Sequence, residues 1–401
     1  MTTSTDLPQL PFARRDVFDV PERYRALRAD GPIARVRTQT GDLAWLVTTY
    51  EETRRLLADD RLGRSHPDPD RAPRISNSAL FGGPSGDFAT EKATHDRMRR
   101  LLVPAFSRRR TNALREHVQS IVDELLDRMA KRTPPVDLHE ELSFPLPALV
   151  ICELLGVPYE DRDHFRELSD RTAGLSDAAA SAAAKQELAA YVHRLIAVKR
   201  AAPAEDVLSD LVAVADSGRE DLTDDDIAAM ASSLLFAGHE TTVARIDYGT
   251  VLLLSHPTQL AALRRDPDLV PGAVEEIMRM AAPSDHGLPR YARVDIEMGD
   301  VTIRAGDAVL LLPMAANRDE QVFPDPDRFD IFRTLAEPHL GFGYAHHFCI
   351  GAGLARIELQ TVFGTLFRRF PTLALAVPAE RLRRLTQRLT GGLAELPVTW
   401  E

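Results

Sequence analysis

The amino-acid sequence predicts a fold that is mostly α-helical with a small β component. Apolar residues recur three and four positions apart through most of 95–202 and again through 223–255, which is typical of helices. Segments rich in β-forming residues are short and lie near 34–49 and 288–312. Because no Ser/Gly spacer, charge block or repeat divides the chain, we expect residues 1–401 to form a single domain, large enough to bury a cofactor.

The composition argues against several classes of protein. The net charge of −11 argues against a nucleic-acid binder, which would need an excess of basic residues. Two cysteines, Cys152 and Cys349, are too few for a disulfide framework. The N-terminus lacks the pattern of a signal peptide, and no stretch has the length and apolar character of a membrane span. We therefore predict a cytoplasmic protein without membrane or nucleic-acid partners, and the preference for Arg over Lys is typical of a high-GC, actinobacterial-type genome.

The N-terminal part mixes helices and strands. Residues 22–31 have the pattern of a short amphipathic helix, and residues 51–60 have the pattern of another. Between them, 34–38 and 44–49 are rich in β-formers and are predicted to pair across a short turn. The segment 61–91 is rich in Pro, Gly, Asp and Ser and is predicted to be a long loop, which in a compact domain is often functional.

The following hundred residues, 95–202, are predicted to be mainly helical. The spacing of apolar residues favours helices over 113–132 and 149–157. The alanine-rich stretch 177–200 is expected to be helical because alanine has the highest helix propensity.

The longest predicted helix covers residues 223–255. Thr223 and Asp226 have the spacing of a capping box at its start, and Pro257 follows its end. A helix of this length measures roughly 45–50 Å and would cross the whole domain. Its first half is apolar on nearly all faces, so we expect it to be buried.

The C-terminal part returns to short elements. Two helices are expected at 258–265 and about 271–281, followed by short strands within 288–312. An irregular Pro/Asp-rich run and a Gly-rich loop then lead to a helix at about 351–369 and a C-terminal hairpin.

The Gly-rich loop contains Cys349, which lies directly before a predicted helix. The unpaired N–H groups and the positive dipole end of that helix would stabilise a thiolate. A thiolate ligand lets haem iron cleave the oxygen–oxygen bond, because it donates electron density to the metal. Two other interpretations remain open on these residues alone: a buried, inert thiol, and a zinc site built from His346, His347 and Cys349, although no fourth ligand is visible.

A second polar group interrupts the middle of the long helix, where the sequence reads Ala237-Gly238-His239-Glu240-Thr241-Thr242. An acid and two hydroxyls in a buried helix are costly unless they have partners or a function. Gly238 adds a cost of about 1 kcal/mol relative to Ala in a helix interior. The cluster indicates a functional site, with a helix kink stabilised by threonine hydrogen bonds as the alternative.

These residues resemble the cytochrome P450 family. Phe342, Cys349 and Gly351 match its haem-binding signature, Phe-x-x-Gly-x-x-x-Cys-x-Gly, but Ala345 stands where the family has its first signature glycine. A methyl group at that position requires a permissive backbone angle or a slight shift of the loop. The resemblance implies that Cys349 is the ligand to the haem iron and that His347 meets a haem propionate.

The resemblance also assigns roles to the middle of the long helix, which matches the family's oxygen-activation motif. It implies that Glu240 and Thr241 guide protons to iron-bound dioxygen. It further implies that Gly238 opens the groove where oxygen sits and that Ala237 lies against the cofactor. His239 is a polar variant at a variable place, for which a hydrogen bond within the fold is the favoured interpretation.

Three further motifs occur in the family's order. His95 and Arg99, four residues apart on one predicted helix face, match its His-x-x-x-Arg pair for the haem propionates, and Arg290 matches another propionate ligand. Glu276 and Arg279 match a buried Glu-x-x-Arg pair. Arg328, in Phe323-Pro324-Asp325-Pro326-Asp327-Arg328-Phe329, is the predicted third member. The role of this ion-pair cluster would be to brace the cysteine loop.

The resemblance implies a triangular, mostly helical prism around a buried haem b. It implies a monooxygenase that inserts one atom of O2 into a bulky lipophilic substrate, with electrons from a ferredoxin and ferredoxin reductase. We expect a monomer whose ferredoxin docks near Arg100, Arg108 or Arg356. A peroxide-driven or oxidative-coupling enzyme and a non-catalytic haem- or ligand-binding protein are the alternatives, and the presence of Glu240 and Thr241 argues against the peroxide-driven one.

Substrate choice in this family depends on regions that correspond here to residues 61–94, 161–202, 282–289 and 390–394. These regions are rich in Ala, Gly and Pro, which favours a bulky apolar ligand. The resemblance to actinobacterial members of the family implies tailoring of a secondary metabolite such as a polyketide, macrolide or peptide.

Overall fold

The computed structural model describes residues 7–78, 82–161, 164, 167–168, 171–172, 177–285, 287–386, 388 and 390–401. Helices make up most of the regular structure. The α-helices are α1 (Glu22–Asp30), α2 (Tyr50–Leu57), α3 (Glu91–Leu102), α4 (Arg108–Ala113), α5 (Arg115–Met129), α6 (Pro145–Leu155), α8 (Ala178–Ala201), α9 (Val207–Asp216), α10 (Asp224–Leu254), α11 (Pro257–Arg265), α12 (Val270–Met280), α13 (Pro313–Ala316) and α14 (Ala352–Arg369).

Short helical turns of other types join these helices. They are the π-helix η1 (His139–Ser143) and the 3-10 turns η2 (Tyr159–Asp161), η3 (Pro267–Leu269), η4 (Leu340–Phe342), η5 (Ala345–His347) and η6 (Ala379–Arg381). Two of them, η4 and η5, form the loop before Cys349, so this loop has a defined local conformation.

The strands form one main sheet and two small ones. They are β1 (Ile33–Arg37), β2 (Leu43–Val47), β3 (Leu62–Gly63), β4 (Val136–Asp137), β5 (Leu288–Ala292), β6 (Ile296–Met298), β7 (Val301–Ile303), β8 (Ala308–Leu311), β9 (Ala374–Leu375) and β10 (Pro397–Thr399). The main sheet has the order β1-β2-β8-β5-β3, in which only the β2–β8 pair is parallel. The others are β4-β10-β9 and β6-β7.

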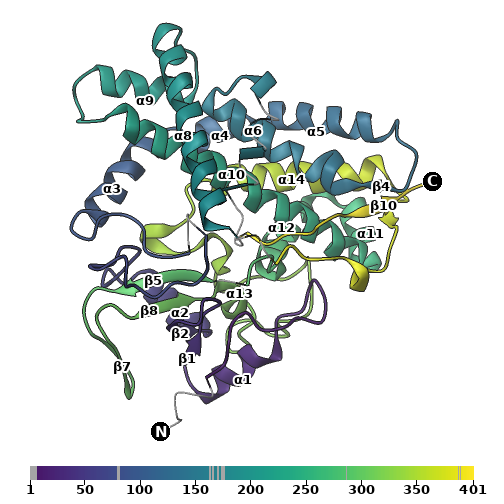
Figure 1. The fold of residues 1–401 in the computed structure, drawn as a ribbon. Helices are drawn as coiled ribbons and strands as arrows, with labels where there is room; N and C mark the ends of the chain where they lie inside the picture. The colour runs from purple at the N-terminus through teal and green to yellow at the C-terminus, as the bar shows by residue number, and fades with distance from the viewer. Residues whose placement is uncertain are drawn as a thin grey trace.

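The main sheet is covered on both faces. Along β8, Ala308 and Leu310 belong to one hydrophobic cluster and Val309 and Leu311 to another, as the alternation of side chains along a strand requires. All four residues are buried, which explains why this segment has a continuous apolar run. Figure 1 shows this sheet on one side of the molecule, with the larger set of helices on the other.

The helical part is organised around α10. Thr223 caps its first turn and forms the predicted capping box with Asp226, and the helix packs against α6, α8, α9, α12 and α14 (Figure 1). Twenty of its residues are buried, so its near-uniform apolar character reflects a position inside the protein. None of the described helices combines the length and the apolar character that crossing a bilayer would require.

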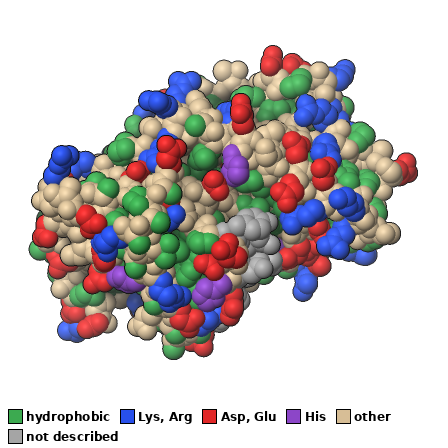
Figure 2. Space-filling model, turned by 90° about the horizontal axis from the view of Figure 1, so that it is seen from above, with side chains coloured by type: hydrophobic (Ala, Val, Ile, Leu, Met, Phe, Trp, Pro, Cys, Tyr) green, Lys and Arg blue, Asp and Glu red, His purple; other side chains and the backbone are tan. Residues whose placement is uncertain are grey.

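The structure confirms the predicted fold class and most of the predicted elements. It pairs β1 with β2 and forms helices where the apolar periodicity predicted them. Two details differ: the predicted loop 61–91 contains the short strand β3, and the C-terminal strand β10 pairs with β4 as well as with β9. On the face seen in Figure 2, acidic and basic side chains are interspersed.

Candidate active site

Cys349 lies at the end of a tightly closed loop and directly before α14. Its backbone N–H donates to the carbonyl oxygen of Phe342 at 2.8 Å, which closes the loop. The residue is solvent-accessible and is not in a disulfide. Burial by surrounding protein atoms raises the pKa of the thiol, whereas the N–H groups of Gly351 and Ala352 and the charge of Arg99 lower it. A thiol that is accessible yet densely surrounded lies in a concave site, with the helix start directed at its sulfur.

Ala345 adopts the conformation that its position in the loop requires. Its φ angle is +50°, in the left-handed region where a side chain normally costs about 1–2 kcal/mol. The sequence comparison with the family's glycine predicted that a methyl group here needs a permissive backbone angle. The loop therefore keeps its shape and carries a local strain instead of shifting.

Basic side chains gather beside the cysteine loop. Arg290, on β5, is buried, and the rings of His95 and His347 lie 4.5 Å apart. Burial and the neighbouring charges of Arg290 and His95 lower the pKa of His347 to about 2. Burial and the charge of Arg64 lower the pKa of Arg290 to about 10. These shifts show that the four side chains form one cluster, which we call the cation cluster: Arg64, His95, Arg290 and His347.

The cation cluster is short of negative charge. Within the described part of the chain, no carboxylate forms an ion pair with Arg290 or His347, and Glu91 reaches Arg64 only at 4.0 Å. Arg290 is a buried cation without a counter-charge, and the two histidines beside it are held neutral, so the cluster favours an anionic ligand. The two propionates of a haem would supply two carboxylates, and Cys349 would supply the iron ligand, so the residues present fit this cofactor.

Arg99 contacts the backbone of the cysteine loop. It lies on the same face of α3 as His95, and its guanidinium donates to the carbonyl oxygen of Phe348 at 2.7 Å. This bond ties α3 to the residue before Cys349 and places a positive charge near the sulfur, where it lowers the pKa of the thiol. Arg99 therefore fits the site as a brace and a charge beside Cys349.

One stripe of the long helix is accessible although the helix as a whole is buried. Ser233, Ala237 and Thr241 are exposed, and they follow one another at intervals of four residues on one side of α10. The Thr241 hydroxyl donates to the carbonyl oxygen of Ala237 at 2.8 Å. The stripe matches the predicted placement of Ala237 and Thr241 beside a ligand.

Gly238 has a different role from the predicted one. A Cβ atom at this position would come within 2.8 Å of the Ile151 side chain on α6. The missing side chain therefore allows α10 and α6 to pack closely, and it does not open a groove on the exposed stripe. This corrects the prediction that Gly238 provides the space for oxygen.

Glu240 is held from the C-terminal turn. Its carboxylate accepts a hydrogen bond from the Thr390 hydroxyl at 3.0 Å, and the Arg388 guanidinium lies at 3.8 Å. Its neighbour His239 is fully buried and hydrogen-bonds to the carbonyl oxygen of Phe144 at 3.2 Å, as the prediction of a bond within the fold requires. The acid of the motif is thus buried beside the accessible Thr241.

The predicted ion-pair cluster forms, but with a different third member. Glu276 and Arg279 are buried and make two hydrogen bonds of 2.8 Å to each other. The third member is Arg333, whose guanidinium lies 3.2 Å from Glu276, whereas Arg328 is 65% exposed and pairs with Asp330. Arg328 contributes only its carbonyl oxygen, which accepts hydrogen bonds from Arg279 and Arg333.

This ion-pair cluster is connected to the cysteine loop through one residue. Arg279 donates to the backbone carbonyl of Asn317 at 2.9 Å, and the Asn317 side chain accepts from the backbone N–H of Leu340 at 2.7 Å. Leu340 begins η4, and η4 ends at Phe342, whose carbonyl binds the Cys349 amide. The predicted bracing role therefore has a continuous path of hydrogen bonds.

The basic residues predicted for electron-donor docking differ in their availability. Arg356 donates to both carboxylate oxygens of Glu275, at 2.6 and 2.9 Å. Arg100 lies 3.4 Å from Glu220. Arg108 is exposed, and no carboxylate among the described residues forms an ion pair with it. Arg108 is the one of the three that retains a free charge for a partner.

The structure does not assemble the zinc set that the sequence left open. Among the described residues, the group that could hold a metal consists of His95, Asp96 and His346, without Cys349 or His347. Of the two cysteines, Cys152 has the features of an inert thiol. It is buried, and burial raises its pKa to about 12.

Three residues of the site were missed by reasoning from the sequence. Arg64 enters the cation cluster because β3, which ends one residue earlier, pairs with β5 beside Arg290. Arg333 lies in an irregular segment, and Thr390 lies in the C-terminal turn that reaches Glu240. All three depend on contacts between distant segments, for which the local sequence carries no signal.

Comparisons with known proteins agree with this geometry. The family model of the cytochrome P450 matches residues 176–376. Pentalenolactone synthase of Streptomyces exfoliatus is 46% identical over 98% of this chain and 100% of its own length.

Solved structures agree over the whole chain. The pimaricin epoxidase PimD is 42% identical with a TM-score of 0.89, covering 99% of this chain and 100% of that one. The mycinamicin VIII C21 methyl hydroxylase MycCI of Micromonospora griseorubida is 37% identical, also with a TM-score of 0.89, covering 98% and 100%. With this fold and a cysteine in the position that the family's signature requires, the chain belongs to the cytochrome P450 family.

Proposed function

We propose that this cytochrome P450 monooxygenase tailors a bulky lipophilic secondary metabolite, such as a polyketide, macrolide or peptide, by hydroxylation or epoxidation. The observation that carries the proposal is the pairing of an accessible Cys349, held under the start of α14, with a buried cation cluster that lacks an anion. This arrangement supports haem b as the cofactor, with Cys349 as the iron ligand and Arg290, His95 and His347 facing its propionates.

When bound, the haem supplies the redox chemistry that places one oxygen atom in the substrate and reduces the other to water. The protein's own task is to deliver protons without admitting bulk water. Thr241 presents its hydroxyl on the accessible stripe of α10, and Glu240 lies next to it in a buried position. A buried acid beside an accessible hydroxyl is suited to passing a proton from the C-terminal turn toward the site.

The direction of that path follows from the contacts of Glu240. Its carboxylate touches Thr390 and lies near Arg388, so protons can reach it from the turn at 388–392. The Thr241 hydroxyl, now bonded to the Ala237 carbonyl, can rotate toward a ligand on the exposed stripe. We therefore propose Glu240 as the proton donor to the site and Thr241 as the group that places the proton.

Electrons would come from a separate ferredoxin with its reductase, the donors that the resemblance to bacterial members of the family implies. We place the docking region near Arg108, on α4, which packs against α14, the helix that begins after Cys349. Arg108→Glu is expected to slow the reduction of the iron by the donor protein and to leave reduction by dithionite unchanged. A rate of reduction by the donor protein that is the same in Arg108→Glu and in the wild type would contradict this placement.

The names of several similar proteins support the substrate class. Pentalenolactone synthase, a pimaricin epoxidase and a mycinamicin hydroxylase are named for secondary metabolites. The test is to screen such compounds by the change in haem absorbance on binding, and then to run turnover with 18O2. Incorporation of one 18O atom per product, dependent on NADPH and the electron donors, is the expected result. Product formed only with peroxide, or no product from any ligand that binds, would overturn the proposal.

A further inference from the structure

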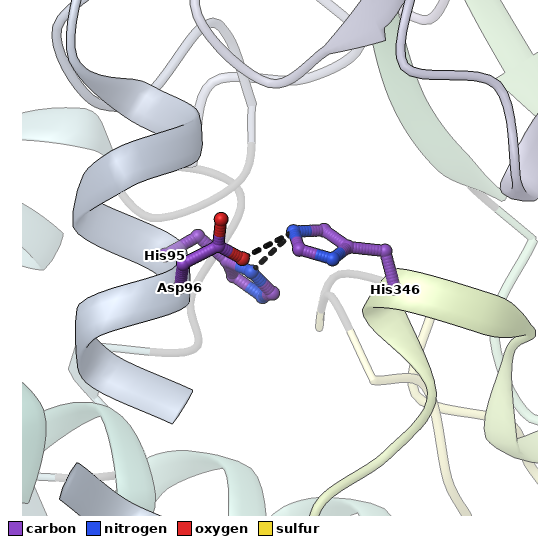
Figure 3. Close-up of side chains that lie close together, drawn as sticks. All are labelled: His95, Asp96 and His346. Carbon is purple, nitrogen blue, oxygen red and sulfur yellow. Dashed lines mark hydrogen bonds and ion pairs between the residues drawn. The ribbon is translucent and has the colours of Figure 1, made fainter. Parts of the chain in front are cut away.

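The residues His95, Asp96 and His346 converge on one point beside the cysteine loop. His95 and Asp96 occupy adjacent positions on α3, and His346 belongs to η5, three residues before Cys349. Figure 3 shows the imidazole of His346 directed at the two side chains that leave α3. The Nε2 atom of His346 lies 2.9 Å from Nδ1 of His95 and 3.2 Å from a carboxylate oxygen of Asp96.

A count of protons shows why hydrogen bonding alone leaves this arrangement incomplete. Nε2 of His346 can carry one proton, and two acceptor atoms compete for it. If His95 supplies the proton instead, the lone pair of His346 faces a carboxylate oxygen. In each case one of the two close contacts lacks a proton of its own. A single cation would satisfy all three lone pairs at once.

The geometry also matches the requirements of a metal ion. The three ligand atoms lie within 4.8 Å of one another. A tetrahedral ion roughly 2.0–2.1 Å from each ligand needs neighbouring ligand atoms about 3.3 Å apart. The two separations from His346, 2.9 and 3.2 Å, are close to that value. Two imidazoles and one carboxylate form a nitrogen and oxygen set suited to Zn²⁺ and similar divalent ions, with a fourth position open to water.

The surroundings of the three residues would let an ion enter and would also hold it. His95 is buried, and the side chains of His346 and Asp96 are 32% and 49% exposed, so an ion can enter from the surface and be held against the protein. His95 uses Nδ1 here, which leaves its Nε2 atom for the proposed contact with a haem propionate. The two roles of this residue are therefore compatible.

We propose that His95, Asp96 and His346 form a binding site for a divalent transition-metal ion of the Zn²⁺ type. The ion would join α3 to the loop that holds Cys349, in addition to the bond from Arg99 to Phe348. It would thus restrain the cysteine loop from outside the haem site. This inference does not depend on the proposed function, since it concerns only protein atoms.

The test is a calorimetric titration of the purified full-length protein with Zn²⁺, read together with its haem absorbance. The wild type is expected to bind one ion, and His346→Ala and Asp96→Asn are each expected to weaken the affinity at least about 10- to 100-fold. The control is His117→Ala, because His117 is an exposed histidine 3.7 Å from a single carboxylate, Glu153, and should keep wild-type affinity. An unchanged affinity in His346→Ala, or no saturable binding in the wild type, would overturn the site.

A second measurement distinguishes loss of metal binding from loss of folding in the variants. Zn²⁺ is expected to raise the thermal midpoint of the wild type and of His117→Ala, because it binds the native state, and to leave the midpoint of His346→Ala unchanged. Circular dichroism before titration shows whether each variant is folded. An equal thermal shift in wild type and His346→Ala would place the ion elsewhere.

Discussion

Two sets of ionisable side chains lie near the cysteine loop or connect to it, and they differ in charge balance. In the ion-pair cluster, Glu276, Arg279 and Arg333 pair with one another, and the guanidinium of Arg279 also donates to backbone carbonyls. In the cation cluster, the only hydrogen bond that Arg290 donates within the described part of the chain goes to the carbonyl of Pro289, and the positive charge of Arg64 lies near it. The charges of the ion-pair cluster have partners without a ligand, whereas the cation cluster lacks an anion.

This difference separates structural from ligand-binding residues more clearly than burial does. Arg279 and Arg290 are both buried, at 1% and 6% exposure. A complete set should fail when one member is removed, because an uncompensated charge remains in the interior. An incomplete set of cations should tolerate the loss of one member in the free protein and show the loss only when the anion binds. The following predictions use that contrast.

The largest effect is expected from Glu276→Gln. The substitution leaves Arg279 and Arg333 without their counter-charge, and breaking a buried pair costs about 3–5 kcal/mol. Urea unfolding of the purified protein measures this loss. Arg328→Ala is the matched control, since its exposed side chain pairs only with Asp330 and should change the stability by no more than about 0.5 kcal/mol. A larger loss in Arg328→Ala than in Arg333→Ala would restore the pairing expected from the sequence.

Arg290→Leu is expected to show the opposite pattern. The protein without haem should be as stable as the wild type or more so, because one buried and unpaired cation is gone. Haem affinity should fall about 10- to 100-fold, since a charge-assisted hydrogen bond contributes about 1.5–3 kcal/mol. Haem titration and urea unfolding of the same preparation measure both quantities. A loss of stability without a loss of haem affinity would show that Arg290 belongs with the structural residues.

Acid should weaken the support of the cysteine loop through Glu275. Burial alone would raise the pKa of this carboxyl, but hydrogen bonds from Arg356 and His339 outweigh it and lower the pKa to about 2. The unfolded pKa is about 4.3, so the stabilisation is present above that pH and disappears as the pH falls toward 2. The half-exposed surroundings limit it to about 1–2 kcal/mol. The drop in stability between pH 6 and pH 3 should therefore be smaller in Glu275→Gln than in the wild type.

The smallest effect is expected from Ala345→Gly. Glycine removes the cost of a Cβ at φ +50° but also loses more backbone entropy on folding, so the net gain should be at most about 1 kcal/mol. Thermal unfolding measures it, with Ala352→Gly as the control, because Ala352 is in the first turn of α14 and should only be destabilised. If both variants lose stability equally, the loop carries no strain at this position.

The parts predicted from the sequence are those that depend on local patterns. The long helix and its capping box follow from the spacing of Thr223, Asp226 and the apolar residues after them, and the structure has both. The need for an unusual backbone angle at Ala345 followed from one residue in a loop of known pattern, and the angle is present.

The parts that were wrong or missed depend on packing between distant segments. Arg328 and Arg333 both lie in an irregular run, where no periodicity tells which side chain turns inward. Gly238 was assigned to the ligand side, but the direction of its missing side chain is fixed by the crossing of α10 with α6. Arg64 lies in the site because β3 pairs with β5, and the sequence of a two-residue strand does not predict that pairing.

The central claim is that Cys349 and the cation cluster hold a haem whose iron is bound by a thiolate. The most direct measurement is the absorbance spectrum of the purified protein after reduction and exposure to carbon monoxide. The account predicts a strongly red-shifted band in the wild type and in Cys152→Ala, and its loss in Cys349→Ser. A wild-type protein that binds haem without that shift, or a shifted band that survives Cys349→Ser, would contradict the account.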